Sequence, residues 1–376
     1  MLIFTGIFLL LNFFSLCELC HGFSNRQKKV IIAVFSLFFA VLSAIYSGQA
    51  GDFNFYKAHF ELVTVKNLFT VTQNQFEYLY EVLNVLIRQL TPHYSVLRFV
   101  FALFVMALWY QIYFKVRKQD SGKYALTAFY AVWALQSGHI FTIRSTAAIA
   151  LCIYSIRYIK SKSVIKFLLL TAVAVFIHYM SVMWFPAYLI YHSRFRLRFF
   201  YAGIAAIAAL SRKIPDILRF AADYMPGQLA YKVTYYLGYG ITDTYGNYYG
   251  YGIQLVKALA NNLLLVIVFQ YIVYQKRKKD GCREGDTEKF FRLFLFGIMI
   301  YIAAFSTSLA MSRAATLYTF VQFLLLPEIF DLDIVKRPRE NRFFVLFVFS
   351  MYLYLRMAVQ LKANGCLPFI TIFEGR

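Results

Sequence analysis

Long runs of apolar residues alternate with short polar segments along nearly the whole chain. They lie near residues 2–17, 30–47, 95–114, 124–139, 143–159, 164–180, 180–191, 199–211, 253–274, 290–309, 314–330 and 343–357. A membrane-crossing helix needs about 20 apolar residues, so the shorter runs fit tilted, kinked or re-entrant helices. The pattern predicts an all-α polytopic transmembrane helical bundle of about 12 helices, with roughly 10 to 14 as the range. We expect one integral membrane domain over residues 1–376.

Composition agrees with this class. The chain has 376 residues, of which 60% are hydrophobic, 20% aromatic and 15% charged, and its mean hydropathy is +0.57. Soluble domains carry about 25% charged residues. The formal net charge of +21 comes from Lys and Arg gathered in short loops between apolar runs. This distribution follows the positive-inside rule and favours contact with membrane lipids rather than with nucleic acid.

Taking the basic loops as cytoplasmic places both termini outside, together with two longer segments at 48–94 and 211–252. The first apolar run has no basic residues before it and basic residues after it, which favours a retained helix over a signal peptide. The second outer segment is rich in Tyr and Gly. Aromatic rings beside amides and carboxylates suit carbohydrate, and they equally suit an interfacial aromatic belt with turns.

Sequence motifs for cofactors and common catalytic centres are few. The chain contains Cys17-Glu-Leu-Cys20-His21, which has the spelling of a c-type haem attachment motif. It lies at the expected cytoplasmic end of a membrane helix with no soluble fold around it, so we expect no haem. The sequence has no glycine-rich phosphate loop, no GxSxG and no HExxH. We therefore expect no cofactor and no metal site.

Four charged or titratable residues fall at the expected outer face: Asp52 after the second crossing, Arg144 at the start of the fifth, His178 at the end of the sixth and Arg313 after the tenth. An ionisable group at membrane depth costs roughly 2.5–3.5 kcal/mol on insertion scales and is a functional candidate. Two guanidinium groups suit a pyrophosphate, and a histidine or carboxylate suits proton transfer from a sugar hydroxyl. Individually, the four also fit snorkelling, packing or loop roles.

Several short motifs give a family resemblance. They are Gly51-Asp52-Phe-Asn-Phe-Tyr56, Thr142-Ile-Arg144-Ser-Thr-Ala-Ala148, Phe176-Ile-His178-Tyr-Met-Ser181, the segment from Ser312-Arg313 through Tyr318 to Leu326-Pro327, and the tail from Asn364 to Phe373. In this order they resemble the EpsG family of bacterial polysaccharide polymerases, a branch of the Wzy-type polymerases. The chain departs from the family pattern at Phe53 and Asn54, at Ser145, where Gln is common, and at Gly365 and Phe369.

The resemblance implies a multi-pass glycosyltransferase of the bacterial inner (cytoplasmic) membrane. Such an enzyme joins repeat units carried on undecaprenyl pyrophosphate at the outer face, in O-antigen, capsule or exopolysaccharide synthesis. Its expected partners are the lipid-linked oligosaccharide, a flippase and a chain-length regulator. We expect transfer without a metal. Arg144 and Arg313 would bind pyrophosphate, His178 or Asp52 would act as base, and Tyr56 and Tyr318 would contact substrate.

Three other functions remain open on sequence grounds. A glycosyltransferase that adds single lipid-linked sugars shares these features, but usually shows paired acidic residues in its first outer loop, whereas Asp52 has no adjacent carboxylate. A membrane O-acyltransferase also uses an intramembrane histidine, but draws its donor from the cytoplasm. A flippase or transporter tends to show internal repeats, and no convincing repeat is visible here.

Overall fold

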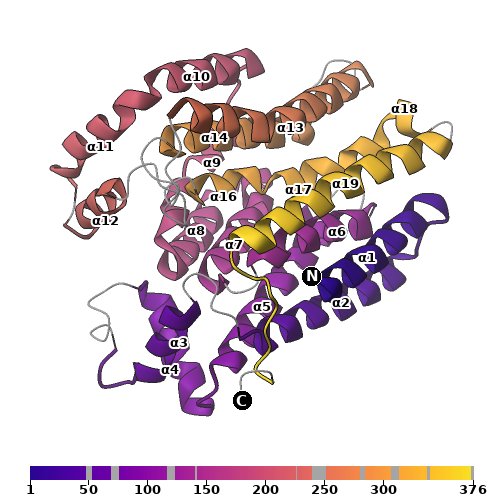
Figure 1. The fold of residues 1–376 in the computed structure, drawn as a ribbon. Coiled ribbons are helices and arrows are strands. Elements are labelled where there is room, and N and C mark those ends of the chain that lie inside the picture. Colours follow the sequence, from indigo (N-terminus) through magenta and orange to yellow (C-terminus); the bar gives the residue numbers. More distant parts are fainter. Residues whose placement is uncertain are drawn as a thin grey trace. The chain divides into compact units, whose positions relative to one another are not determined.

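The computed structural model describes residues 1–47, 53–68, 76–116, 123–139, 142–225, 227–238, 251–279, 284–305, 313–336 and 339–373. These residues are overwhelmingly helical, and their only β pairing is one isolated bridge between Tyr46 and Thr371. The helices divide between two compact units, one formed by Met1–Val182 with Phe330–Arg376, and the other by Met183–Ile329 (Figure 1).

The first unit contains four of the five described helices that are long and apolar enough to cross a membrane. Its elements are α1 (Leu2–Cys20), α2 (Asn25–Ile45), α3 (Phe53–Leu62), α4 (Tyr78–Leu90), α5 (Tyr94–Gln111) with a π-helical extension (Ile112–Val116), α6 (Ala125–Gln136), a 3-10 turn (Ser137–His139), α7 (Ile143–Lys160), α8 (Val164–Ile177), α18 (Asp333–Lys336) and α19 (Arg339–Ala363). Within this unit, α6 is buried along its whole length and packs against α1, α2 and α19. It therefore forms the centre of the unit.

Side-chain hydrogen bonds cap the N-termini of α2 and α6. The Ser24 hydroxyl accepts a hydrogen bond from the Gln27 backbone N–H at 3.2 Å, and the Gln27 amide oxygen accepts one from the Ser24 N–H at 2.9 Å. This capping box starts α2. The buried Glu18 carboxylate of α1 accepts from the Thr127 N–H at 2.9 Å and so caps the start of α6. Lys28 of α2 pairs with Glu18 at 2.9 Å and neutralises its charge.

The second unit is built around α14, which packs against α9, α10, α13 and α16. Its elements are α9 (Ala187–His192), α10 (Leu197–Leu210), a 3-10 turn (Ser211–Lys213), α11 (Ile214–Ala222), α12 (Gly227–Gly238), α13 (Tyr251–Lys279), α14 (Asp286–Phe305), η5 (Arg313–Ala315), α16 (Thr316–Thr319) and α17 (Gln322–Leu325). Two further 3-10 elements, η3 (Tyr179–Trp184) and η6 (Leu326–Asp331), span the boundaries with the first unit. Gly297 on α14 allows close packing, because a Cβ there would lie 2.6 Å from Tyr318 Cβ.

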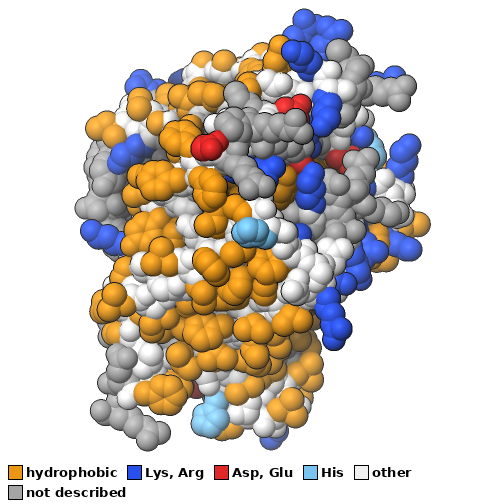
Figure 2. All heavy atoms as spheres, turned by 90° about the vertical axis from the view of Figure 1, so that its right-hand side faces the viewer, with side chains coloured by type: hydrophobic (Ala, Val, Ile, Leu, Met, Phe, Trp, Pro, Cys, Tyr) orange, Lys and Arg blue, Asp and Glu red, His pale blue; other side chains and the backbone are white. Residues whose placement is uncertain are grey.

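The prediction of an all-α polytopic membrane protein is confirmed. Five described helices are long and apolar enough to cross a membrane: Leu2–Cys20, Asn25–Ile45, Tyr94–Val116, Leu255–Lys279 and Glu340–Ala363. Figure 2 shows broad areas of apolar side chains on one face, with Lys and Arg mainly at their borders. Of the other predicted crossings, those at 124–139, 164–180 and 199–211 form shorter helices of 12 to 14 residues. The apolar runs at 180–191 and 314–330 are each divided into short helical pieces.

Candidate functional site

The candidate site lies in the first unit, where α3, α4, α7 and α8 each contribute an end or a face. Tyr56 projects from α3, and Arg144 occupies the first turn of α7. Glu77 is the residue that precedes α4, and His178 is the residue that follows α8. All four side chains come from separate parts of the sequence, so only the folded chain brings them together.

Arg144 is at the centre of this cluster. Its Nη1 donates to Glu77 Oε2 at 2.5 Å, and its Nη2 donates to the Tyr56 hydroxyl at 3.0 Å. Its guanidinium carbon also lies 4.9 Å from the ring centroid of Tyr56, 4.5 Å from that of Phe76 and 5.2 Å from that of Tyr80. The side chain is 12% exposed. Cation–π contacts and a charged hydrogen bond thus hold the cation at a largely buried position.

Glu77 links Arg144 to His178. Its Oε2 atom binds Arg144, while its Oε1 atom lies 3.3 Å from His178 Nδ1 and accepts the Tyr179 backbone N–H at 3.0 Å. Burial alone would raise the pKa of Glu77, but the Arg144 charge and the bonds from His178 and Tyr179 outweigh it and lower that pKa to about 2. Glu77 is therefore a buried carboxylate that stays ionised at neutral pH.

His178 ends α8 in an extended conformation, with its backbone N–H bonded to the Ala174 carbonyl at 2.8 Å. This change of direction turns the ring toward Glu77. Its side chain is 26% exposed, compared with 4% for Glu77. In the tautomer that carries its proton on Nδ1, the ring donates to Glu77 and presents Nε2 as a base. This is the arrangement that a general base requires.

An aromatic wall surrounds the charged groups. His59 on α3 is 2% exposed, and its ring lies 4.3 Å from the Phe76 ring and 6.3 Å from the Tyr80 ring. Burial, and then the nearby Arg144 charge, lowers the pKa of His59 to about 4. Burial also raises the pKa of Tyr80 above its usual value. At neutral pH His59 and Tyr80 are therefore uncharged, and Glu77 forms its ion pair with Arg144.

A second arginine of the first unit adjoins the same short helix. Arg98 on α5 is 1% exposed, donates through Nη1 to the Tyr46 carbonyl, and lies 4.9 Å from the Phe53 ring. Phe53 and Tyr56 are one turn apart on α3, so each covers a different arginine. The position of α3 is thereby fixed by contacts at both arginines.

The residues that the sequence singled out fall into three groups. Arg144, His178 and Tyr56 come together as described. Asp52 lies outside the described residues. Arg313 and Tyr318 belong to the second unit, where Arg313 is exposed on η5 and Tyr318 is fully buried, with its hydroxyl donating to the Met183 carbonyl at 2.6 Å.

Sequence reasoning missed Glu77. The segment 48–94 contains four acidic residues, Asp52, Glu61, Glu77 and Glu81, and the family motif at Gly51–Tyr56 marks Asp52 but not Glu77. A usable signal was the position of Glu77 between two aromatic residues, Phe76 and Tyr78. Within the described residues, no group of three or more His, Cys, Asp or Glu side chains could hold a metal ion.

The fold and the site together define a multi-pass helical membrane protein with a buried Arg–Glu–His cluster at the helix ends. The model of the EpsG family matches residues 2–371. The chain therefore belongs to the EpsG family, and this membership indicates a polysaccharide polymerase-type, glycosyltransferase-like function. No curated protein and no solved structure matches the chain.

Proposed function

We propose that this protein is a polysaccharide polymerase that joins undecaprenyl-pyrophosphate-linked repeat units at the outer face of the bacterial inner membrane. Family membership supports the reaction class. The observation that carries the proposal is Glu77, which contacts Arg144 with one oxygen and His178 with the other. A carboxylate that orients an imidazole beside a fixed cation suits a transfer between a hydroxyl acceptor and an anionic leaving group.

His178 would act as the general base. It takes the proton from the acceptor sugar hydroxyl as that oxygen attacks the anomeric carbon of the growing chain. Glu77 keeps the ring in the productive tautomer and stabilises the imidazolium that forms, as in other carboxylate–histidine pairs. Asp52 remains the alternative base.

Arginine charge would stabilise the departing pyrophosphate, so the proposal needs no metal. Both terminal nitrogens of Arg144 already have partners, Glu77 and Tyr56. A pyrophosphate oxygen would therefore replace Tyr56 on Nη2 and leave the pair with Glu77 intact. Arg313, which is exposed, would supply the second cation. Tyr318 would contact substrate only by exchanging its bond to the Met183 carbonyl.

The proposed partners are a flippase and a chain-length regulator, and the proposed location is the bacterial inner membrane. A flippase would deliver each lipid-linked unit to the outer face, and a chain-length regulator would set when extension stops. The basic loops would face the cytoplasm, where they meet anionic lipids. Segments 48–94 and 211–252 would then lie outside, and the first of them carries Tyr56 and Glu77.

Deletion of the gene tests the proposal. We expect single lipid-linked repeat units to accumulate on the outer face and long polymer to disappear, with both effects reversed by the intact gene. A complementing copy with Glu61→Gln is the matched control, because Glu61 is an exposed carboxylate of the same segment whose side chain is 54% accessible. Accumulation on the inner face would instead support a transporter and contradict the polymerase.

A further inference from the structure

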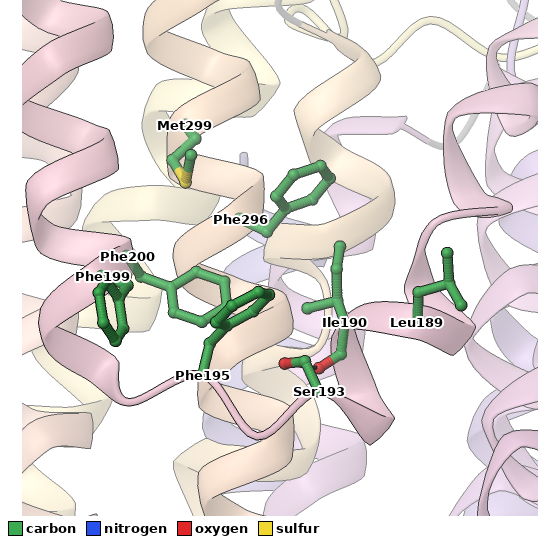
Figure 3. A pocket seen from close by; sticks show the side chains of 8 residues that line it. All are labelled: Leu189, Ile190, Ser193, Phe195, Phe199, Phe200, Phe296 and Met299. Atoms are coloured by element: carbon green, nitrogen blue, oxygen red, sulfur yellow. Dashed lines mark hydrogen bonds between the residues drawn. The ribbon is translucent and has the colours of Figure 1, made fainter.

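The second unit contains an apolar groove with a basic loop at one end. The groove has a volume of about 320 Å³ and lies between α9, α10 and α14. Figure 3 shows Leu189 and Ile190 on one side, Phe195 and Phe199 on the other, and Phe296 and Met299 along α14. Among the described residues that line it, Ser193 is the one polar side chain. Dry cavities with such walls bind apolar molecules.

The groove has a direction. Arg292, four residues before Phe296 on α14, donates to the Ser193 carbonyl and so fixes the loop at this end. From Arg292 to Met299, α14 rises by about 10 Å, at roughly 1.5 Å per residue. The polar end therefore lies at the start of α14, which the positive-inside pattern assigns to the cytoplasmic face. The end of the groove at Met299 lies deeper along the helix.

Charge at the polar end is unbalanced. Acidic side chains near the start of α14 are already engaged: Glu288 with Arg277 at 2.5 Å, Glu284 with Arg292, and Asp286 with the Tyr191 hydroxyl at 2.7 Å. The loop between α9 and α10 and the first turn of α10 carry three exposed arginines. They are Arg194, Arg196 and Arg198. Within the described part of the chain, no carboxylate forms an ion pair with any of the three.

We propose that this groove binds an anionic phospholipid of the cytoplasmic leaflet, with one acyl chain between α10 and α14 and the phosphate at Arg194 and Arg196. The exposed rings of Phe195 (62%) and Phe199 (54%) favour this occupant, because they offer an apolar surface directly beside the arginines. An anionic phospholipid matches this arrangement, because its charged headgroup lies at the membrane interface and its acyl chains lie deeper in the bilayer. This lipid site is independent of the transfer reaction.

Photocrosslinking in nanodiscs tests the site. The full-length protein is reconstituted in phosphatidylcholine discs with a small fraction of phosphatidylglycerol that carries a diazirine on its acyl chain. The comparison probe has the same chain on a phosphatidylcholine headgroup. We expect the phosphatidylglycerol probe to label peptides that contain Ile190, Phe195 and Phe296. Each basic residue near anionic lipid contributes about 1 kcal/mol, so R194Q/R196Q should weaken apparent probe binding roughly 30-fold.

The matched control is K162Q/K166Q, which removes two exposed basic residues from the loop between α7 and α8 and from the first turn of α8. It should leave labelling of the groove unchanged. Equal labelling by the two headgroups, or labelling that survives R194Q/R196Q, would overturn the proposal. Displacement of the probe by undecaprenyl phosphate more readily than by phosphatidylglycerol would also overturn it, since the groove would then hold the substrate carrier.

Discussion

Replacing Glu77 with Gln keeps the shape of the side chain and removes its charge. In the native cluster one carboxylate oxygen meets Arg144, and the other accepts from the Tyr179 N–H and contacts His178 Nδ1. An amide has one oxygen and one NH₂ group. If its oxygen faces Arg144, its NH₂ group faces the Tyr179 N–H and selects the wrong His178 tautomer. If its oxygen faces Tyr179, its NH₂ group faces the arginine cation.

The size of the expected effect on stability and on rate follows from these two orientations of the amide. One unsatisfied buried donor costs about 1–3 kcal/mol of stability, which a well-packed membrane protein tolerates. The wrong histidine tautomer costs a carboxylate–histidine catalyst about 10⁴-fold in rate. We therefore expect Glu77→Gln to lower the polymerisation rate by about 10³- to 10⁴-fold, or about 4–5.5 kcal/mol in activation free energy. Protein accumulation should change little.

The assay compares polymer length and amount on gels from a deletion strain complemented at matched protein level. Glu61→Gln, in the same segment, should restore normal polymer. Polymer within tenfold of wild type from Glu77→Gln would refute the role given to the Glu77–His178 pair. Loss of the protein itself would show a structural role, which rate measurements on detergent-purified protein at equal folded fraction would separate from catalysis.

The remaining predictions concern charge, pH, packing and topology. Arg144→Lys should insert normally but lose about 10²–10³-fold in polymerisation, because an ammonium cannot hold two partners as a planar fork does; near-normal polymer on gels would remove Arg144 from the site. His59 has a pKa of about 4 when folded, against 6.5 unfolded. Between pH 6.5 and pH 4 the unfolded chain binds a proton at His59 that the folded protein does not, so stability is complete above pH 6.5 and falls as pH is lowered toward 4. Lowering pH from 7 to 5 should therefore cost about 2 kcal/mol of unfolding free energy, and His59→Phe should remove this loss in chemical denaturation. Gly297→Ala should lower the melting temperature through about 1–3 kcal/mol of overpacking against Tyr318, and an unchanged melting temperature would contradict the close approach. Membrane-impermeant thiol reagents should fail to label cysteines at residues 275–289 from the periplasm. Labelling there would contradict the expected topology, in which this loop faces the cytoplasm.

The sequence predicted the helical class and part of the site. Arg144 and His178 stand out because each is an ionisable residue at the end of an apolar run. Glu77 does not, because its importance arises from the chain direction at the start of α4 and not from any spacing in the sequence. A carboxylate in a polar segment of the sequence is usually exposed, and only the fold shows that Glu77 is buried.

Helix interruptions were also only partly predictable. The apolar runs at 180–191 and 314–330 look like single crossings by hydropathy. In the structure each is divided, and Pro186 and Pro327 lie within the two runs. Proline removes a backbone donor and ends or bends a helix, yet membrane helices often accommodate it, so its presence alone did not decide the outcome.

Reconstitution tests the central claim most directly. The purified protein is placed in proteoliposomes that contain undecaprenyl-pyrophosphate-linked repeat units and no other protein, and the products are separated by length over time. The account predicts polymers of increasing length with release of undecaprenyl pyrophosphate, and no such products from Glu77→Gln. Intact protein that leaves the units unjoined, or that only moves them across the bilayer, would contradict it.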